Sequence, residues 1–200
     1  MQHQVIIIHG GDVFATYEEY LNNLKQKEIS LDRLRTKDWK ANLKEELGED
    51  FDVLNLKMPN PQNARFIEWK IWFEKFIPYF NQEVIFVGHS LGGLFLAKYL
   101  SENDYPKKIK ATLLIAASYN TPQHNSLVDF TLNTPLAKFA QQGGKIILYH
   151  SKNDPVVAFG DLGRYSQELP NATLRIFEDR GHFNSETFPE IVEDIKKLAS

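Results

Sequence analysis

One stretch, VIFVGHSLGGLFLAKYL at residues 84–100, restricts the fold of this chain more than any other part of its sequence. Its first four residues are apolar and mostly β-branched, which is typical of a strand buried on both faces. Glycines then flank Ser90, and apolar residues recur at helical spacing from Leu91 onward. We therefore expect a buried strand, a tight turn with Ser90 at its apex, and a helix.

A strand, a sharp turn and a helix around one serine form the layout of a nucleophile elbow. Such a turn strains the backbone of the serine, so that its hydroxyl projects clear of the sheet. Side chains two residues to either side would collide across the bend, which explains the glycines at positions 88 and 92. The alternative is an ordinary turn in which Ser90 only caps the helix.

Apolar runs elsewhere predict five more strands, at residues 4–8, 51–56, 109–116, 145–150 and 173–177, with helices between them. This alternation predicts an α/β fold, a three-layer sandwich whose mostly parallel sheet of about six strands has helices on both faces. Without a linker or repeat, residues 1–200 are expected to form one domain. Only residues 117–133 are irregular and long enough for a lid, which would be minimal.

Composition excludes several classes of partner and chemistry. The net charge of −3 gives no reason to expect binding to nucleic acid or to an anionic membrane. No apolar run approaches the roughly 20 residues that span a bilayer, and no signal sequence precedes the first strand. The absence of cysteine excludes disulfides and thiolate catalysis and suits a reducing compartment. A cytoplasmic protein is the default expectation.

A nucleophilic serine needs a neighbouring base, and the base needs an orienting carboxylate. In a parallel sheet both should follow later strands, because the carboxyl ends of the strands meet at one edge. Asp154 comes directly after the predicted strand 145–150, and His182 follows the predicted strand 173–177. The sequence therefore predicts a site of Ser90, Asp154 and His182.

The rival acids and bases are less well placed: Asp129, Asp161, Asp179, His3, His9, His89, His124 and His150. The three aspartates lie in the irregular segment, in a predicted helix, and too near His182 along the chain. Of the histidines, His9 is expected to brace its glycine turn and His89 to point away from the site. The others lie at the terminus, in the irregular segment, or ahead of the acid.

An anionic intermediate needs two preorganised hydrogen-bond donors. The first should be the amide of Leu91, at the start of the helix, where the helix dipole favours negative charge. The second should come from the glycine turn after the first strand, from Gly11 or next from Asp12. Five aromatic residues beside these turns either line an apolar pocket or belong to the core: Phe14, Tyr17, Tyr119, Phe159 and Phe183.

Four motifs together resemble the α/β-hydrolase superfamily: HGG at 9–11, GHSLGG at 88–93, KNDPVV at 152–157 and GHF at 181–183. The small size and the segment MPNPQNARFIEWKIWFEKF at 58–76 are similar to the retinoblastoma-binding-protein-nine-like serine hydrolases, which include the bacterial YdeN-like proteins. The resemblance spans essentially the whole chain. It implies a compact hydrolase without a large lid, with Ser90, Asp154 and His182 as its triad.

The chain departs from this family pattern at two points. The retinoblastoma-binding motif of the human relative needs a cysteine, and this chain has none, so that partner is not carried over. HGGD stands where many lipases have HGGG, which leaves both Gly11 and Asp12 open as the second donor.

The pattern predicts hydrolysis of a small acyl ester through an acyl-enzyme, with thioester and amide substrates left open. This chemistry calls for a small-molecule acyl substrate and for no metal or cofactor. Two alternatives use the same residues differently. One is a protein-binding module on an inactive hydrolase fold, and the other is a lyase or acyltransferase with the same triad.

Overall fold

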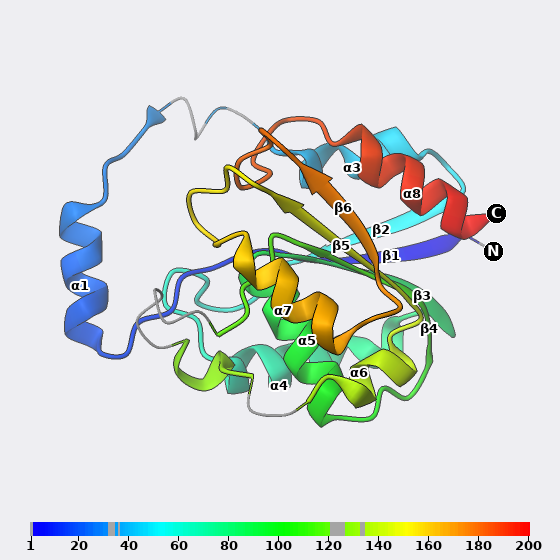
Figure 1. Ribbon diagram of the computed structural model, residues 1–200, viewed down its shortest axis with the longest axis horizontal. Helices are drawn as coiled ribbons and strands as arrows, with labels where there is room; N and C mark the ends of the chain where they lie inside the picture. Colours follow the sequence, from blue (N-terminus) through cyan, green and yellow to red (C-terminus); the bar gives the residue numbers. More distant parts are fainter. Residues whose placement is uncertain (1, 32–34, 36, 121–126, 133–134) are drawn as a thin grey trace.

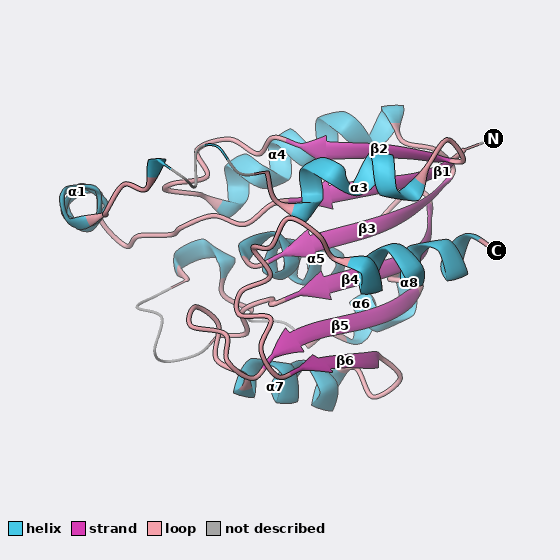
Figure 2. Cartoon of the chain, turned by 90° about the horizontal axis from the view of Figure 1, so that it is seen from above, coloured by secondary structure: helices cyan, strands magenta, loops and turns pink. Residues whose placement is uncertain are grey.

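The computed structural model describes residues 2–31, 35, 37–120, 127–132 and 135–200. Within these residues six strands form one sheet in the order β2-β1-β3-β4-β5-β6, and every neighbouring pair is parallel. Their bounds are β1 (His3–Ile8), β2 (Phe51–Leu56), β3 (Glu83–His89), β4 (Lys108–Ile115), β5 (Lys145–Ser151) and β6 (Thr173–Phe177). Figure 2 shows all six arrowheads at the same end of the sheet. The six predicted strands are confirmed.

Helices cover both faces of the sheet, which confirms the predicted three-layer sandwich (Figures 1 and 2). One face carries α3 (Trp39–Leu47) and α8 (Pro189–Ala199). The other carries α4 (Phe66–Phe76), α5 (Leu91–Glu102), α6 (Ala137–Gln142) and α7 (Gly160–Glu168), with short 3₁₀ turns at Ile77–Tyr79 and Val128–Phe130.

The apolar runs of the strands fill two cores, because successive side chains point to opposite faces. In β1, Ile6 and Ile8 pack with α4 and α5, whereas Val5 and Ile7 pack with α3 and α8. All four side chains are fully buried. A strand with a helical layer on each side needs this uninterrupted apolar sequence, and an alternating one would expose polar groups to a core.

Strands β1 and β3 lie side by side, but α3, on the connection after β1, and α5, which follows β3, cover opposite faces of the sheet. The turns after β1 and β3 therefore separate at the carboxyl edge. This reversal is the topological switch point at which open α/β sheets bind ligands. The fold thus places the predicted serine turn and the predicted glycine turn at the same crevice.

Helix α1 (Tyr17–Gln26) lies beyond the carboxyl ends of the strands, outside both helical layers (Figures 1 and 2). None of its residues is buried, and Thr16 caps it by accepting a hydrogen bond from the Glu19 amide. The expected lid, residues 117–133, lies partly outside the described residues. No helix within the described part of the chain is long and apolar enough to cross a membrane.

Helix α5 starts so close to β1 that Gly92 has no room for a side chain. A Cβ at this position would lie 2.3 Å from the Ile8 carbonyl oxygen. Gly163 in α7 is the opposite case, because a Cβ there would meet nothing within 4 Å.

We expect Gly92→Ala to lower the free energy of unfolding by about 3 kcal/mol, because the backbones of α5 and β1 must separate. Gly163→Ala should raise it by about 0.5–1 kcal/mol, since glycine is unfavourable inside a helix. Urea denaturation of the two variants measures both changes. Equal stability of the two variants would contradict the packing described here.

Candidate active site

The turn after β3 holds Ser90 in a conformation that non-glycine residues rarely adopt, with φ 55° and ψ −122°. The Ser90 amide donates to the carbonyl of Ile115 at the end of β4, 2.8 Å away, which ties the turn to the sheet. A Cβ at Gly88 would lie 2.6 Å from the Gly93 Cα, so the turn closes only with glycine there. The strained geometry expected of a nucleophile elbow is therefore present.

Asp154 and His182 come together at this edge of the sheet, as their positions after β5 and β6 predict. His182 Nδ1 lies 2.9 Å from Asp154 Oδ2 and 3.1 Å from Oδ1. The Asp154 side chain is fully buried, and that of His182 is 9% exposed. The amides of Val156 and Val157 also donate to Asp154 Oδ1, at 2.8 and 3.0 Å.

This arrangement keeps Asp154 ionised. Burial raises the pKa of the carboxyl group, but the hydrogen bonds from His182 and from the Val157 and Val156 amides outweigh it, so the pKa lies below its usual value. An ionised carboxylate can only accept hydrogen bonds, so the His182 proton must sit on Nδ1. The other ring nitrogen, Nε2, is then free to act as a base.

His182 reaches the nucleophile turn through His89, the residue before Ser90. His89 Nε2 lies 2.9 Å from the His182 carbonyl oxygen, and the two ring centroids are 4.9 Å apart. The hydrogen bonds of the described residues do not include one between Ser90 and the His182 ring. Such bonds are often long without substrate and tighten in the reacting complex.

The glycine turn after β1 also lies at this crevice. His9 Nδ1 lies 2.6 Å from the Gly10 carbonyl oxygen, and His9 Nε2 accepts from the Met58 amide, so His9 braces the turn as predicted. The Asp12 amide donates to the Pro61 carbonyl, 2.8 Å away. Because that donor is already used, Gly11 is the better placed of the two residues to bind an oxyanion.

A hollow of about 210 Å³ joins these turns, and Ser90, Leu91 and Gly11 line it together with Phe14 and Asn23. Asn23 comes from α1, so the outlying helix forms part of the wall. The remaining lining residues are Asp12, Val13, Ser118, Leu127 and Val156.

Of the five aromatic residues considered for the pocket, only Phe14 lines this hollow. Phe183 belongs to the core, the second of the two alternatives, because it is 1% exposed and packs against Phe177 and Phe188. Tyr119 packs on Tyr165, Phe159 packs on His150, and Tyr17 faces a separate hollow. Residues near a catalytic turn in sequence can thus belong to the core behind it.

The other acids and bases that the sequence offered have other hydrogen-bond partners, are exposed, or lie outside the described residues. Asp129 accepts from the Phe66 amide and Asp161 accepts from the Tyr119 amide, while Asp179 is exposed. His124 lies outside the described residues. His150 is buried at the end of β5, with Nδ1 3.0 Å from the Ser151 carbonyl oxygen.

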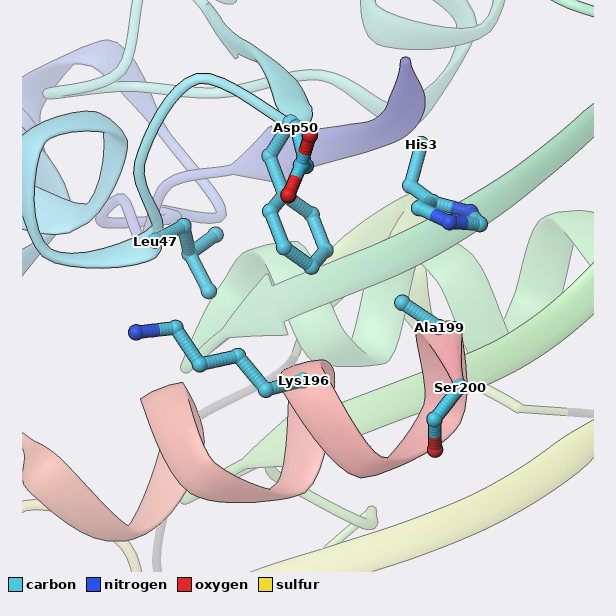
Figure 3. Close-up of a pocket in the computed structure, with 7 residues that line it drawn as sticks. His3, Leu47, Asp50, Lys196, Ala199 and Ser200 are labelled. Atoms are coloured by element: carbon cyan, nitrogen blue, oxygen red, sulfur yellow. The ribbon is translucent and has the colours of Figure 1, made fainter. Parts of the chain in front are cut away.

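A second hollow, of about 500 Å³, lies at the opposite edge of the sheet, near both chain termini (Figure 3). Lys196 on its wall donates to the Glu46 carbonyl, and the Ser200 hydroxyl donates to the Lys197 carbonyl rather than to His3, which also lines the hollow. Within the described residues, no three His, Asp or Glu side chains come together as a metal site would require. The carboxyl edge therefore remains the candidate site.

The sequence did not predict that residues of α3 contact the site. Lys40 Nζ lies 3.4 Å from His89 Nδ1, and the Trp39 indole nitrogen donates to the Phe183 carbonyl, 2.9 Å away. Both residues belong to the first turn of α3. Trp39 and Lys40 precede Ser90 by about 50 positions, and the sequence signal there was a lysine within an amphipathic helix.

The parallel sheet, the strained serine turn at its switch point and the Asp–His pair behind it define an α/β-hydrolase fold. A family model described as serine hydrolase matches residues 31–198. The chain therefore belongs to the serine hydrolase family, which confirms the resemblance found in the motifs.

Individual relatives agree with this assignment. The chain is 25% identical over 151 residues to the serine hydrolase RBBP9 of Rattus norvegicus, with 74% of this chain and 78% of that protein covered. The structure of the ydeN gene product from B. subtilis superposes with a TM-score of 0.79 at 20% identity, covering 99% of each chain. Est1E from Butyrivibrio proteoclasticus gives a TM-score of 0.62 at 15% identity, covering 99% of this chain and 87% of its own. The two structures share the fold.

We expect Asp154 to stabilise the protein only where it is ionised. Its folded pKa lies below the unfolded value of about 3.9, so its contribution is complete above that value and is lost as pH falls through the folded pKa. The difference in unfolding free energy between wild type and Asp154→Asn should therefore be constant from about pH 7 to about pH 5 and shrink as the pH falls below about 4. Urea denaturation at stepped pH measures this difference.

Asp179→Asn is the matched control, because Asp179 is an exposed carboxylate in the loop that carries His182. It shows how the loss of another carboxylate from the same region changes the unfolding free energy, and the Asp154→Asn values are compared with it. A constant difference between wild type and Asp154→Asn at every pH would show that the Asp154 carboxylate is not specifically stabilised in the folded protein.

Proposed function

We propose that this protein is an esterase that cleaves small acyl esters, with Ser90 as nucleophile, His182 as general base and Asp154 as the orienting acid. The observation that supports it best is the buried Asp154–His182 pair, 2.9 Å apart, at the same edge of the sheet as the strained Ser90 turn. A serine alone at a sharp turn would fit many proteins. A serine at the same edge of the sheet as a histidine whose Nδ1 is held by a buried carboxylate fits acyl transfer.

In the proposed reaction, Ser90 Oγ attacks the ester carbonyl while His182 Nε2 takes the hydroxyl proton. The tetrahedral intermediate collapses, the bond to the alcohol breaks, and His182 returns the proton to the departing alcohol. Water then attacks the acyl-enzyme with the same base, which releases the carboxylic acid and restores Ser90. Asp154 keeps its charge throughout and stabilises the imidazolium that forms in each half.

The amides of Leu91 and Gly11 are proposed to bind the oxyanion. Leu91 is the first residue of α5, where a helix offers its amide no internal partner, and the positive end of the helix dipole lies there. Gly11 lines the same hollow from the other side. Each such donor contributes about 3–4 kcal/mol to the stabilisation of the transition state.

We expect a fluorophosphonate probe to label the folded wild type and not Ser90→Ala, because the Ser90 hydroxyl is the group that His182 activates in the proposed reaction. Ser90→Ala and His182→Ala should each lower kcat by on the order of 10⁴ to 10⁶, and Asp154→Asn by less. In-gel labelling and the hydrolysis of a chromogenic ester measure the two effects.

Ser101→Ala is a matched control, since Ser101 is a buried serine of α5 whose hydroxyl donates to the Ala97 carbonyl. It should label like the wild type. A folded wild type that takes up no probe would favour the binding module on an inactive fold. Labelling without ester hydrolysis would favour the lyase or acyltransferase alternative.

The size of the hollow predicts the acyl chain. About 210 Å³ lies below the roughly 300–1,000 Å³ of pockets that hold drug-sized ligands. In a panel of p-nitrophenyl esters, kcat/KM should be highest for the short acyl chains and fall for the long ones. A maximum at a long chain would mean that α1 moves aside to enlarge the site.

A further inference from the structure

The first turn of α3 lies behind the proposed active site and contacts the loop that carries His182. The Trp39 amide donates to the Ser185 carbonyl, 3.0 Å away, and the Trp39 indole donates to the Phe183 carbonyl. The next residue, Lys40, reaches His89, which in turn reaches the His182 carbonyl. The carbonyl groups of His182, Phe183 and Ser185 thus all accept hydrogen bonds from the same side of the loop.

The contacts of His89 fix where its proton lies. A carbonyl oxygen can only accept, so Nε2, 2.9 Å from the His182 oxygen, must carry the hydrogen. A lysine ammonium can only donate, so Nδ1, 3.4 Å from Lys40 Nζ, must be the acceptor. Both ends of the imidazole therefore require the same neutral tautomer.

The surroundings of His89 and Lys40 agree with these roles. Burial, followed by the nearby Lys40, holds the pKa of His89 well below its usual value, so the ring is neutral at pH 7. Burial also lowers the pKa of Lys40, but the Asp38 carboxylate lies 2.6 Å from Nζ and favours the ammonium form. Lys40 is only 8% exposed, which is unusual for a lysine unless it has a defined partner.

We infer that His89 and Lys40 are positioning residues for the reaction: Lys40 holds His89 in the tautomer that donates to the His182 carbonyl, and this bond sets the imidazole of His182 between Asp154 and Ser90. The inference rests on the proposed function and adds to it residues that touch neither substrate nor reacting atoms.

Such a contact matters because it acts on the backbone of His182 itself, whereas the neighbouring Gly181 amide is held separately, by Asn153 Oδ1 at 2.8 Å. Gly181 and Phe183, on either side of His182, both have positive φ values of 54°, so the loop is tightly bent there. Asp154 fixes one end of the imidazole but not the distance of the ring from Ser90. A displacement of about 1 Å in a reacting group can cost about 100-fold in rate.

Two substitutions at His89 separate the hydrogen bond from simple packing. His89→Phe keeps a ring against His182 but has no donor, whereas His89→Gln loses the ring and places an amide donor near the position of Nε2. We expect His89→Phe to lower kcat by about tenfold or more at nearly constant KM. His89→Gln should restore most of that loss. Lys40→Met should lower kcat in the same direction by less.

Lys98→Met is the matched control for Lys40→Met. Lys98 is 7% exposed, pairs with Glu102 and donates to the Thr131 carbonyl, so it loses comparable contacts away from the His182 loop. It should lower the melting temperature about as much as Lys40→Met and leave kcat unchanged. A loss of kcat in Lys98→Met equal to that in Lys40→Met would overturn the inference, because burial alone would then explain it.

A measurement that needs no turnover keeps the inference separate from the proposed function. The His182 Nδ1 proton bonded to Asp154 gives a downfield resonance in the NMR spectrum. We expect that resonance to sharpen or persist in His89→Gln and Lys98→Met and to shift or broaden in His89→Phe and Lys40→Met. If the wild type hydrolyses no ester, the proposed function fails while this comparison still decides the positioning role.

The inference is wrong if folded His89→Phe keeps both the wild-type kcat and the wild-type resonance, or if His89→Gln is as impaired as His89→Phe. Should His89→Phe not fold, Lys40→Met decides, since methionine has a similar length and lacks the ammonium group that contacts His89 and Asp38. A Lys40→Met protein with unchanged kcat, pH profile and resonance would overturn the role of Lys40.

Discussion

The close approach of α5 to the end of β1 is the contact on which the rest of the site depends. A residue larger than glycine at position 92 would push against the Ile8 and His9 carbonyl oxygens, 2.3 and 2.5 Å from its Cβ. That approach places the first amide of the helix opposite the glycine turn after β1. Ser90 then has to take its strained conformation to connect β3 with a helix so near the sheet.

The parallel sheet supplies the remaining groups, because it brings residues far apart in the chain to one edge. Asp154 and His182 follow β5 and β6, which lie side by side at one end of the strand order. His89 contacts the carbonyl of His182, which is 93 positions later in the sequence. None of these contacts can form before the strands are in register. The site is therefore a property of the assembled sheet, and damage to the packing of any central strand should disturb its geometry before it abolishes the fold.

The sequence was sufficient to predict the strands and the positions of Ser90, Asp154 and His182, because each signal is local. An apolar run marks a strand buried on both faces, and a residue just after it must lie at the carboxyl edge. Contacts made by side chains across the fold had no such signal. Phe183 is adjacent to His182 in sequence, yet the bend at that position turns it into the core. The position of α1 also had no signal in the sequence, because its capping residue marks where the helix begins but not where it lies in the fold.

The burial of Lys40, in the first turn of α3, against His89 costs free energy of desolvation that a gain in folding stability does not explain. A buried lysine and a buried histidine both lose hydration, and an apolar pair of similar size would often be as stable or more so. The polar pair instead fixes the tautomer of His89. The Lys40 ammonium can only donate and the His182 carbonyl can only accept, so the His89 ring between them has a single arrangement of protons. An apolar pair would hold the loop near the sheet without fixing its distance from Ser90. In the proposed reaction, the buried charge of Lys40 therefore serves to position the His182 imidazole rather than to stabilise the fold.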